Sequence, residues 1–279
     1  VSIAQQCYPQ RHWRPMRDID LLVIAEDQPR FEQILRELGF RQQGAQPASF
    51  FAGHHHSMPF HHPSARLWIE VHTGLFRPDS AAGRIPAFQP KALNAQRVAL
   101  THESADIARL PDELQLVYTA VHWGTKLTRV GGIVPVFDTV LLLKQVGAEL
   151  DWGRVLAICE DPTAARHLTL MLAYLERHGL YRVPDIVWSG LAQGRRSLGR
   201  IGLRILLDTI DAYLAGGKHP SGFTSDAVLN IRWDTLLGEG DAGRKLMQLP
   251  WRMLFPPADS RRYDPMRLLR RARSLWQRF

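Results

Sequence analysis

The stretch Arg14-Pro-Met-Arg-Asp18-Ile-Asp20-Leu-Leu-Val23 decides the fold. Its second half is a short apolar run that continues to Ala25 and has the composition of a buried strand. Residues 27–39 follow with apolar side chains at helical spacing and end at a glycine, which is a common helix terminator. The stretch therefore predicts a strand that leads directly into a helix.

A second strand is expected within residues 67–75, where apolar and polar side chains alternate. Leu67, Ile69 and Val71 share one face of this strand, and Trp68, Glu70 and His72 share the other. The histidine-rich residues 41–66 look irregular, and residues 77–95 are rich in proline, alanine and glycine, so that both segments are expected to be loops.

The remainder of the chain has the pattern of helices. Apolar side chains recur at helical spacing over residues 114–127, 134–146, 152–159 and 163–177, and an arginine-rich helix is expected at about 195–215. The fold class is therefore α+β, with a small mixed β-sheet and flanking helices followed by a mainly helical part. We expect an α+β domain over residues 1–105 and a helical domain over 106–279.

Composition excludes several classes of protein. The 279 residues are 45% hydrophobic and 22% charged, which is too apolar for a disordered chain. Two cysteines, Cys7 and Cys159, are too few for a disulfide scaffold or a multi-cysteine zinc site, and fit a reducing compartment. No apolar run reaches the roughly 18 residues of a membrane span, and no secretory signal opens the sequence. We therefore expect a cytoplasmic protein without a transmembrane segment.

The positive charge is concentrated at the C-terminus. The net charge is +8, and residues 261–279 contain seven arginines but a single acidic residue, Asp264. This tail has the pattern of a basic amphipathic helix. It fits either a terminal helix that packs on the body of the protein or a contact for an anionic surface such as a membrane or nucleic acid.

Asp18 and Asp20 are the first candidates for chemistry. Two carboxylates at positions i and i+2 of a strand point to the same face, where they repel each other. A divalent cation would remove this repulsion, so the pair is a candidate Mg²⁺ site. The alternative is a turn capped by Asp18 with Asp20 at a solvated strand end. Glu70, on the polar face of the second strand, is the candidate third acid.

The sequence resembles a known family at these positions. The pattern Arg-x-x-x-Asp-Ile-Asp-Leu-Leu-Val, the helix ending in Leu-Gly-Phe, and Trp-Ile-Glu-Val-His over residues 68–72 are similar to the bacterial uncharacterised nucleotidyltransferase family. That family belongs to the DNA polymerase β-like superfamily, together with aminoglycoside nucleotidyltransferases. The resemblance covers roughly residues 1–185 and includes His122-Trp-Gly-Thr-Lys126.

The resemblance implies roles for individual residues. Asp18, Asp20 and Glu70 match the metal-binding acids, which would hold two Mg²⁺ ions, and Glu70 would assist deprotonation of the acceptor. Arg14 and Arg17 match basic positions that contact phosphate or substrate. The implied reaction transfers a nucleoside monophosphate from a nucleoside triphosphate to a hydroxyl of an unidentified acceptor.

The sequence also departs from the superfamily pattern. A Gly-Ser or Gly-Gly turn that holds the triphosphate is expected upstream of the acidic pair, and none lies between Val1 and Asp18. Either the turn precedes Val1 or the protein lacks it. The second case would favour a catalytically degenerate binding or regulatory module over an enzyme.

The other candidates have two interpretations each. His72 shares the face of Glu70 and would either orient that acid or serve as a structural histidine. His122 and Lys126 lie four residues apart on one face of an expected helix. They would either contact nucleotide or belong to a solvated surface. Asp138, in an apolar helix, is expected to be a partnered buried acid.

Five histidines, His54, His55, His56, His61 and His62, crowd the loop before the second strand. Because no acid or cysteine stands at matching spacing and Gly53, Pro59 and Pro63 indicate a loop, the sequence favours a loop near substrate over a transition-metal site.

Overall fold

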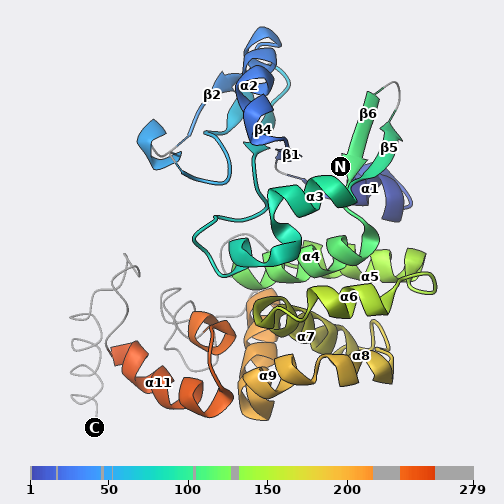
Figure 1. Cartoon of the computed structure of the whole chain (residues 1–279), viewed down its shortest axis with the longest axis vertical. Helices are drawn as coiled ribbons and strands as arrows, with labels where there is room; N and C mark the ends of the chain where they lie inside the picture. Colours follow the sequence, from blue (N-terminus) through green and yellow to red (C-terminus); the bar gives the residue numbers. More distant parts are fainter. Residues whose placement is uncertain are drawn as a thin grey trace. The chain divides into compact units, whose positions relative to one another are not determined.

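The computed structural model describes residues 2–16, 18–44, 47–51, 53–102, 105–126, 132–215 and 233–254. Its fold is α+β, as predicted: a small mixed sheet is combined with many helices (Figure 1). The chain forms two compact units, the first comprising residues 1–118 and 138–164 and the second residues 119–137 and 165–279. The expected domain boundary at residue 105 remains a prediction.

The first unit contains a four-stranded sheet in the order β1-β4-β3-β2. Its strands are β1 (Ile19–Leu22), β2 (Arg41–Gln42), β3 (Phe60–His62) and β4 (Leu67–His72). β1 runs parallel to β4, whereas β2–β3 and β3–β4 are antiparallel pairs. The expected strands thus lie side by side, and residues 41–66 are not entirely irregular, because β2 and β3 lie within them.

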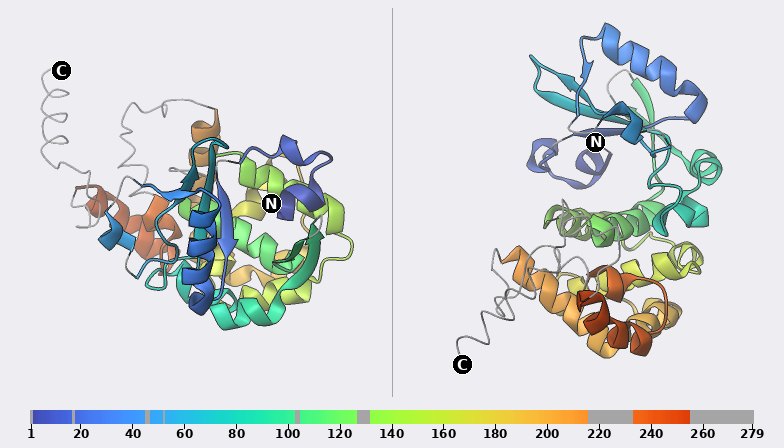
Figure 2. Two further views of the ribbon diagram at one scale, coloured as in Figure 1. Left: turned by 90° about the horizontal axis from the view of Figure 1, so that it is seen from above. Right: turned by 90° about the vertical axis from the view of Figure 1, so that its left-hand side faces the viewer.

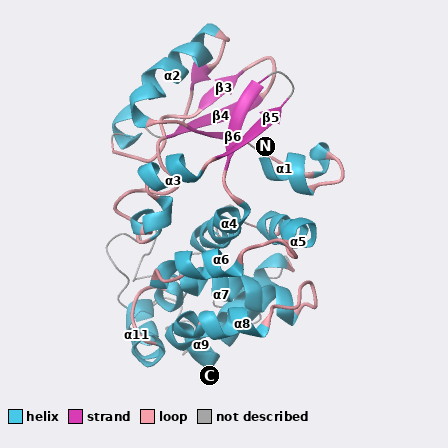
Figure 3. Cartoon of the chain, turned by 45° about the vertical axis from the view of Figure 1, so that its right-hand side comes forward, coloured by secondary structure: helices cyan, strands magenta, loops and turns pink. Residues whose placement is uncertain are grey.

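Helix α2 (Gln28–Glu37) lies along one face of this sheet (Figure 3). The core between them consists of buried apolar side chains from the helix, its exit and the sheet: Leu35, Phe40, Phe60, Ile69 and Val71. Ile19, Leu21 and Val23 from the segment of β1 pack against this core. Gly39, just after the helix, has φ of 88°, a left-handed conformation that favours glycine and ends the helix. The polar side chains of β1 and β4 are therefore left on the opposite face.

Short elements complete the first unit. A hairpin of β5 (Val98–His102) and β6 (Ala105–Arg109) was not expected, and α3 (Pro90–Gln96) lies in a segment expected to be a loop. α1 (Ser2–Cys7) opens the chain. Single-turn 3-10 helices lie at Arg11–Trp13, Ala25–Asp27, Ala48–Phe51, Ala82–Arg84 and Pro86–Phe88.

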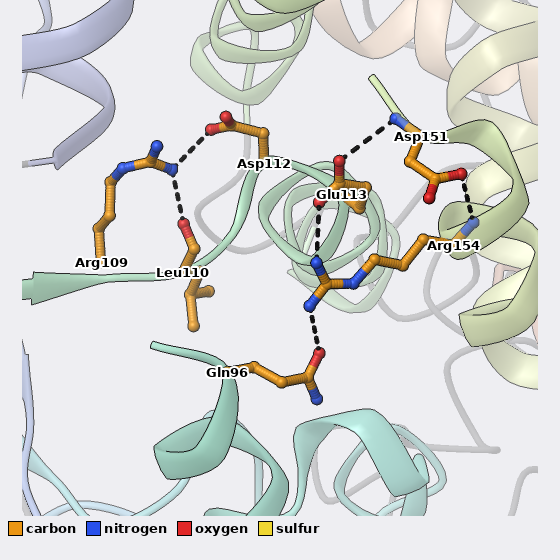
Figure 4. A network of polar contacts seen from close by, with 7 residues as sticks. All are labelled: Gln96, Arg109, Leu110, Asp112, Glu113, Asp151 and Arg154. Carbon is orange, nitrogen blue, oxygen red and sulfur yellow. Dashed lines mark hydrogen bonds and ion pairs between the residues drawn. The ribbon is translucent and has the colours of Figure 1, made fainter. Parts of the chain in front are cut away.

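The start of α4 (Asp112–Lys126) is fixed by polar contacts to β6 and to the helix that contains Arg154 (Figure 4). Arg109 of β6 donates a hydrogen bond to Asp112 at 2.7 Å. Glu113 lies 3.8 Å from the guanidinium of Arg154, which also donates to Gln96 of α3. Arg154 belongs to α6 (Trp152–Ile158), so these contacts connect α3, α4, α6 and the hairpin within one unit.

The second unit is helical. α7 (Pro162–Arg177), α8 (Asp185–Gly190) and α9 (Ala192–Leu214) lie beside one another (Figure 2, yellow to orange), and α11 (Ala242–Leu254) packs against α9. Across both units, α5 (Val134–Val146) matches the expected range, and α4, α6, α7 and α9 differ from theirs by a few residues at their ends. Buried Arg166 of α7 donates to the carbonyl of Leu237 at 2.9 Å.

Among the described residues, no helix is both long enough and apolar enough to cross a membrane. The arginine-rich tail at residues 261–279 lies outside the described residues, so that both interpretations of it, a packed terminal helix and a contact for an anionic surface, remain untested.

Candidate functional site

The pairing of β1 with β4 brings the predicted acids together. In the parallel register Asp20 lies opposite Glu70, and Leu22 lies opposite His72. Because side chains alternate along a strand, the apolar neighbours of these residues face α2 and the carboxylates face the other side. Asp20 and Glu70 thus occupy neighbouring strands on one face, as the sequence pattern required.

His72 joins the two carboxylates. Its Nε2 donates a hydrogen bond to Asp20 Oδ1 at 3.1 Å and lies 3.3 Å from Glu70 Oε2. One ligand atom from each of the three residues lies within 4.8 Å of the other two. We call Asp20, Glu70 and His72 the acidic cluster.

The electrostatics of the cluster favour an imidazolium between two carboxylates. Burial alone would lower the pKa of His72, but its hydrogen bonds to Asp20 and Glu70 outweigh that effect and raise the pKa to about 9. The hydrogen bond from His72 holds the pKa of Glu70 below its usual value, with burial and the charge of Asp20 opposing. The cluster therefore already accommodates one positive charge.

The three side chains differ in their exposure to solvent. The side chain of Asp20 is 55% exposed, that of Glu70 23% and that of His72 12%. The carboxylate of Asp20 is therefore accessible to solutes, whereas Glu70 and His72 are largely shielded from solvent.

The donor atoms fit a hard divalent cation. Asp20 and Glu70 offer carboxylate oxygens, which Mg²⁺ prefers, and an open side at Asp20 leaves room for water or phosphate ligands. Asp18 lies directly before β1 and is exposed, but it is not part of the described group whose ligand atoms converge. Its role as a metal ligand remains a prediction.

Arg14 has a partner distant in sequence. Its guanidinium binds Asp138 through two hydrogen bonds, from Nε to Oδ1 at 2.9 Å and from Nη2 to Oδ2 at 2.8 Å. Tyr8 donates a third hydrogen bond to the same carboxylate at 2.8 Å. The expectation that Asp138 is a partnered buried acid is thereby confirmed. A contact of Arg14 with substrate phosphate remains a prediction.

The other predicted residues have roles that the structure does not test. Arg17 lies outside the described residues. His122 and Lys126 lie on the part of α4 that belongs to the second unit, and their contacts with nucleotide remain predictions.

The cluster has two further neighbours, Tyr118 and His56, of which sequence reasoning missed the first. Tyr118 of α4 is affected by the charges of the acidic residues. Burial raises the pKa of its phenol, the charges of Asp20 and Asp18 raise this pKa further, and the charge of Arg14 opposes them. His56 places Nδ1 3.9 Å from Glu70 Oε2. Tyr118 lies in an apolar helical pattern that gives no indication of this proximity. The histidine-rich loop, which contains His56, was expected to lie near substrate.

The comparison with protein families agrees with this arrangement. The model of the uncharacterised nucleotidyltransferase family matches residues 1–178, which is more than half of the chain. The chain belongs to this family. The matched range of this nucleotidyltransferase includes the acidic cluster, Arg14 and Asp138. No curated protein and no solved structure matches the chain.

Proposed function

We propose that this nucleotidyltransferase moves a nucleoside monophosphate from a nucleoside triphosphate to an acceptor hydroxyl in a Mg²⁺-dependent reaction. The observation that carries the proposal is the register of β1 and β4, which sets Asp20 opposite Glu70. Family membership supports nucleotidyl transfer in general. The donor, the metal and the acceptor hydroxyl are the more specific parts of the proposal.

Asp20, Glu70 and Asp18 would hold the Mg²⁺ ions, of which we expect two. Bound there, the ions would supply charge neutralisation to the triphosphate. The acceptor oxygen forms a bond to the α-phosphorus, the bond from that phosphorus to the pyrophosphate leaving group breaks, and the hydroxyl proton passes to a base.

Glu70 is the base that the arrangement favours. It is ionised, because the hydrogen bond from His72 lowers its pKa, and it is partly shielded from solvent. A carboxylate there accepts the hydrogen bond of the attacking hydroxyl and orients it, which contributes to the rate through positioning. His72 in turn fixes the orientation of Glu70.

The test is calorimetric titration of ATP, GTP, CTP and UTP into the full chain, with and without Mg²⁺. We expect metal-dependent binding of at least one nucleotide to the wild type and its loss in Asp20→Asn. Asp27→Asn is the matched control, because Asp27 is exposed and its side chain caps no backbone N–H of α2. Unchanged Mg²⁺-dependent binding in Asp20→Asn would refute the proposal.

One observation favours a second candidate, a catalytically degenerate binding module. His72 contacts both carboxylates and so occupies the side of each that a bridging cation would use. If this contact persists in the functional protein, the cluster is a structural ion pair. In that case the wild type binds no nucleotide in a Mg²⁺-dependent way, and His72→Gln does not restore the binding.

A further inference from the structure

The histidine-rich loop contains a convergence of rings that the proposed reaction does not use. The ring centroids of His54 and His55 are 4.4 Å apart, those of His54 and His56 are 4.3 Å apart, and those of His55 and His56 are 4.8 Å apart. One ring nitrogen from each residue lies within 4.8 Å of the other two. We call these three residues the histidine triplet.

The backbone explains why three consecutive side chains converge. Neighbouring side chains of an extended strand point in opposite directions, which would separate His55 from the other two. Here the chain turns at Gly53, whose φ of 74° favours glycine, and the amide of His54 donates to Phe51 O at 3.0 Å. Beyond the turn, an isolated bridge pairs His56 with His72. The turn and the bridge together hold the rings on one side.

Two further hydrogen bonds fix the backbone of the triplet against the end of β4. The amide of Thr73 donates to His55 O at 2.8 Å, and the amide of Ser57 donates to Val71 O at 3.0 Å. His55 itself is buried, with 9% of its surface exposed. The triplet is therefore anchored to the sheet on both sides of His56, which preorganises its ring nitrogens.

The hydrogen bonds of the rings also match a metal site. His56 Nδ1 donates to Ser57 O at 2.8 Å, which leaves Nε2 as the ligand atom, and such a bond to a carbonyl typically orients metal-binding histidines. His54 Nδ1 is buried and has no hydrogen-bond partner among the described residues. A buried nitrogen without a hydrogen-bond partner is unfavourable, and a bound cation would satisfy it.

We propose that the histidine triplet binds a divalent transition-metal ion of the Zn²⁺ class through three imidazole nitrogens. Nitrogen donors select such ions over Mg²⁺, and three protein ligands leave a fourth position for water. Ligands of a tetrahedral zinc ion lie about 3.3 Å apart, and the three ring nitrogens lie within 4.8 Å of one another, so the rings would rotate toward one another when the ion binds. The triplet adjoins the acidic cluster, because the ring centroids of His56 and His72 are 5.0 Å apart. The two groups share no residue, and the proposal does not depend on the proposed reaction.

The test is titration of Co²⁺ and Zn²⁺ into the full chain, purified without a histidine tag and after treatment with a chelator. Four-coordinate Co²⁺ gives an intense visible absorption band, and Zn²⁺ should bleach this band by competition. We expect one equivalent of Co²⁺ to bind. His54→Gln should weaken binding by at least about tenfold, in the range of lost metal-site interactions.

His61→Gln is the matched control. His61 lies in β3, close in sequence to the triplet, and its ring stacks on Trp68 with centroids 4.4 Å apart, so binding should be unchanged. Asp20→Asn tests the location of the ion. The proposal is overturned if the wild type binds no Co²⁺, if His61→Gln weakens binding as much as His54→Gln, or if binding depends on Asp20 and not on the triplet. Circular dichroism of each variant identifies one that does not fold, in which case His56→Gln replaces His54→Gln.

Discussion

Replacement of Asp138 by Asn should destabilise the protein strongly. Asp138 is 3% exposed and accepts hydrogen bonds from Tyr8 and from two nitrogens of Arg14. The substitution removes the negative charge and leaves the guanidinium of Arg14 without its counter-ion. Breaking a buried pair in this way costs about 3–5 kcal/mol.

The magnitude must be reduced for solvent, because the side chain of Arg14 is 23% exposed. Water solvates part of the unpaired guanidinium, and the asparagine oxygen still accepts one hydrogen bond. We therefore expect a loss of about 2–3 kcal/mol in the free energy of unfolding, measured by urea denaturation followed by circular dichroism.

The chain offers a matched control for this substitution. Arg77 and Asp79 form the same two-fold contact, at 3.1 and 3.0 Å, but their side chains are 52% and 70% exposed. Asp79→Asn should change stability by less than about 1 kcal/mol, as is typical of exposed pairs. Equal losses in Asp138→Asn and Asp79→Asn would refute the argument that burial makes the Arg14 contact important.

Two further predictions concern the second unit. Burial, with repulsion from Arg166, lowers the pKa of Lys245 from 10.5 to about 8. Between pH 8 and 10.5 the unfolded chain therefore holds this proton while the folded chain releases it. The free energy of unfolding, relative to that of Lys245→Met, should rise by up to about 3 kcal/mol over this pH range. A difference between the two proteins that does not change with pH in urea denaturation would contradict this. Gly194→Ala should cost about 1–3 kcal/mol in thermal unfolding, because a Cβ there would lie 2.7 Å from Ala165 O, whereas Gly202→Ala in the same helix has room and should not destabilise.

The long periodic elements could be predicted from the sequence and the short ones could not. The pattern over residues 134–146 is long enough to define its helix, and the alternation over residues 67–72 defines β4. β2 and β3 have two and three residues, too few for any period to be visible. Residues 77–95 are rich in turn-forming residues, so this segment was predicted to be a loop although α3 lies partly in it. The hairpin of β5 and β6 follows directly after this segment and was not predicted either.

The same distinction applies to the candidate site. The shared face of Glu70 and His72 follows from the period of a strand, and their proximity to Asp20 follows once two apolar strands pair in parallel. The contact between Arg14 and Asp138 joins residues 124 positions apart, and no local pattern encodes it. The convergence of the histidine triplet depends on a turn and an isolated bridge, which sequence spacing does not reveal.

The parallel register of β1 and β4 also determines where the chain tolerates changes in length. Insertion or deletion of one residue inside either strand would turn Asp20 or Glu70 toward α2 and bring an apolar side chain into the cluster, because side chains alternate with a period of two. Residues 23–66 join the strands over a long path, and loop closure costs little more when such a path is extended. Natural variation in length should therefore accumulate in the loops of that path, while both strands keep a fixed length.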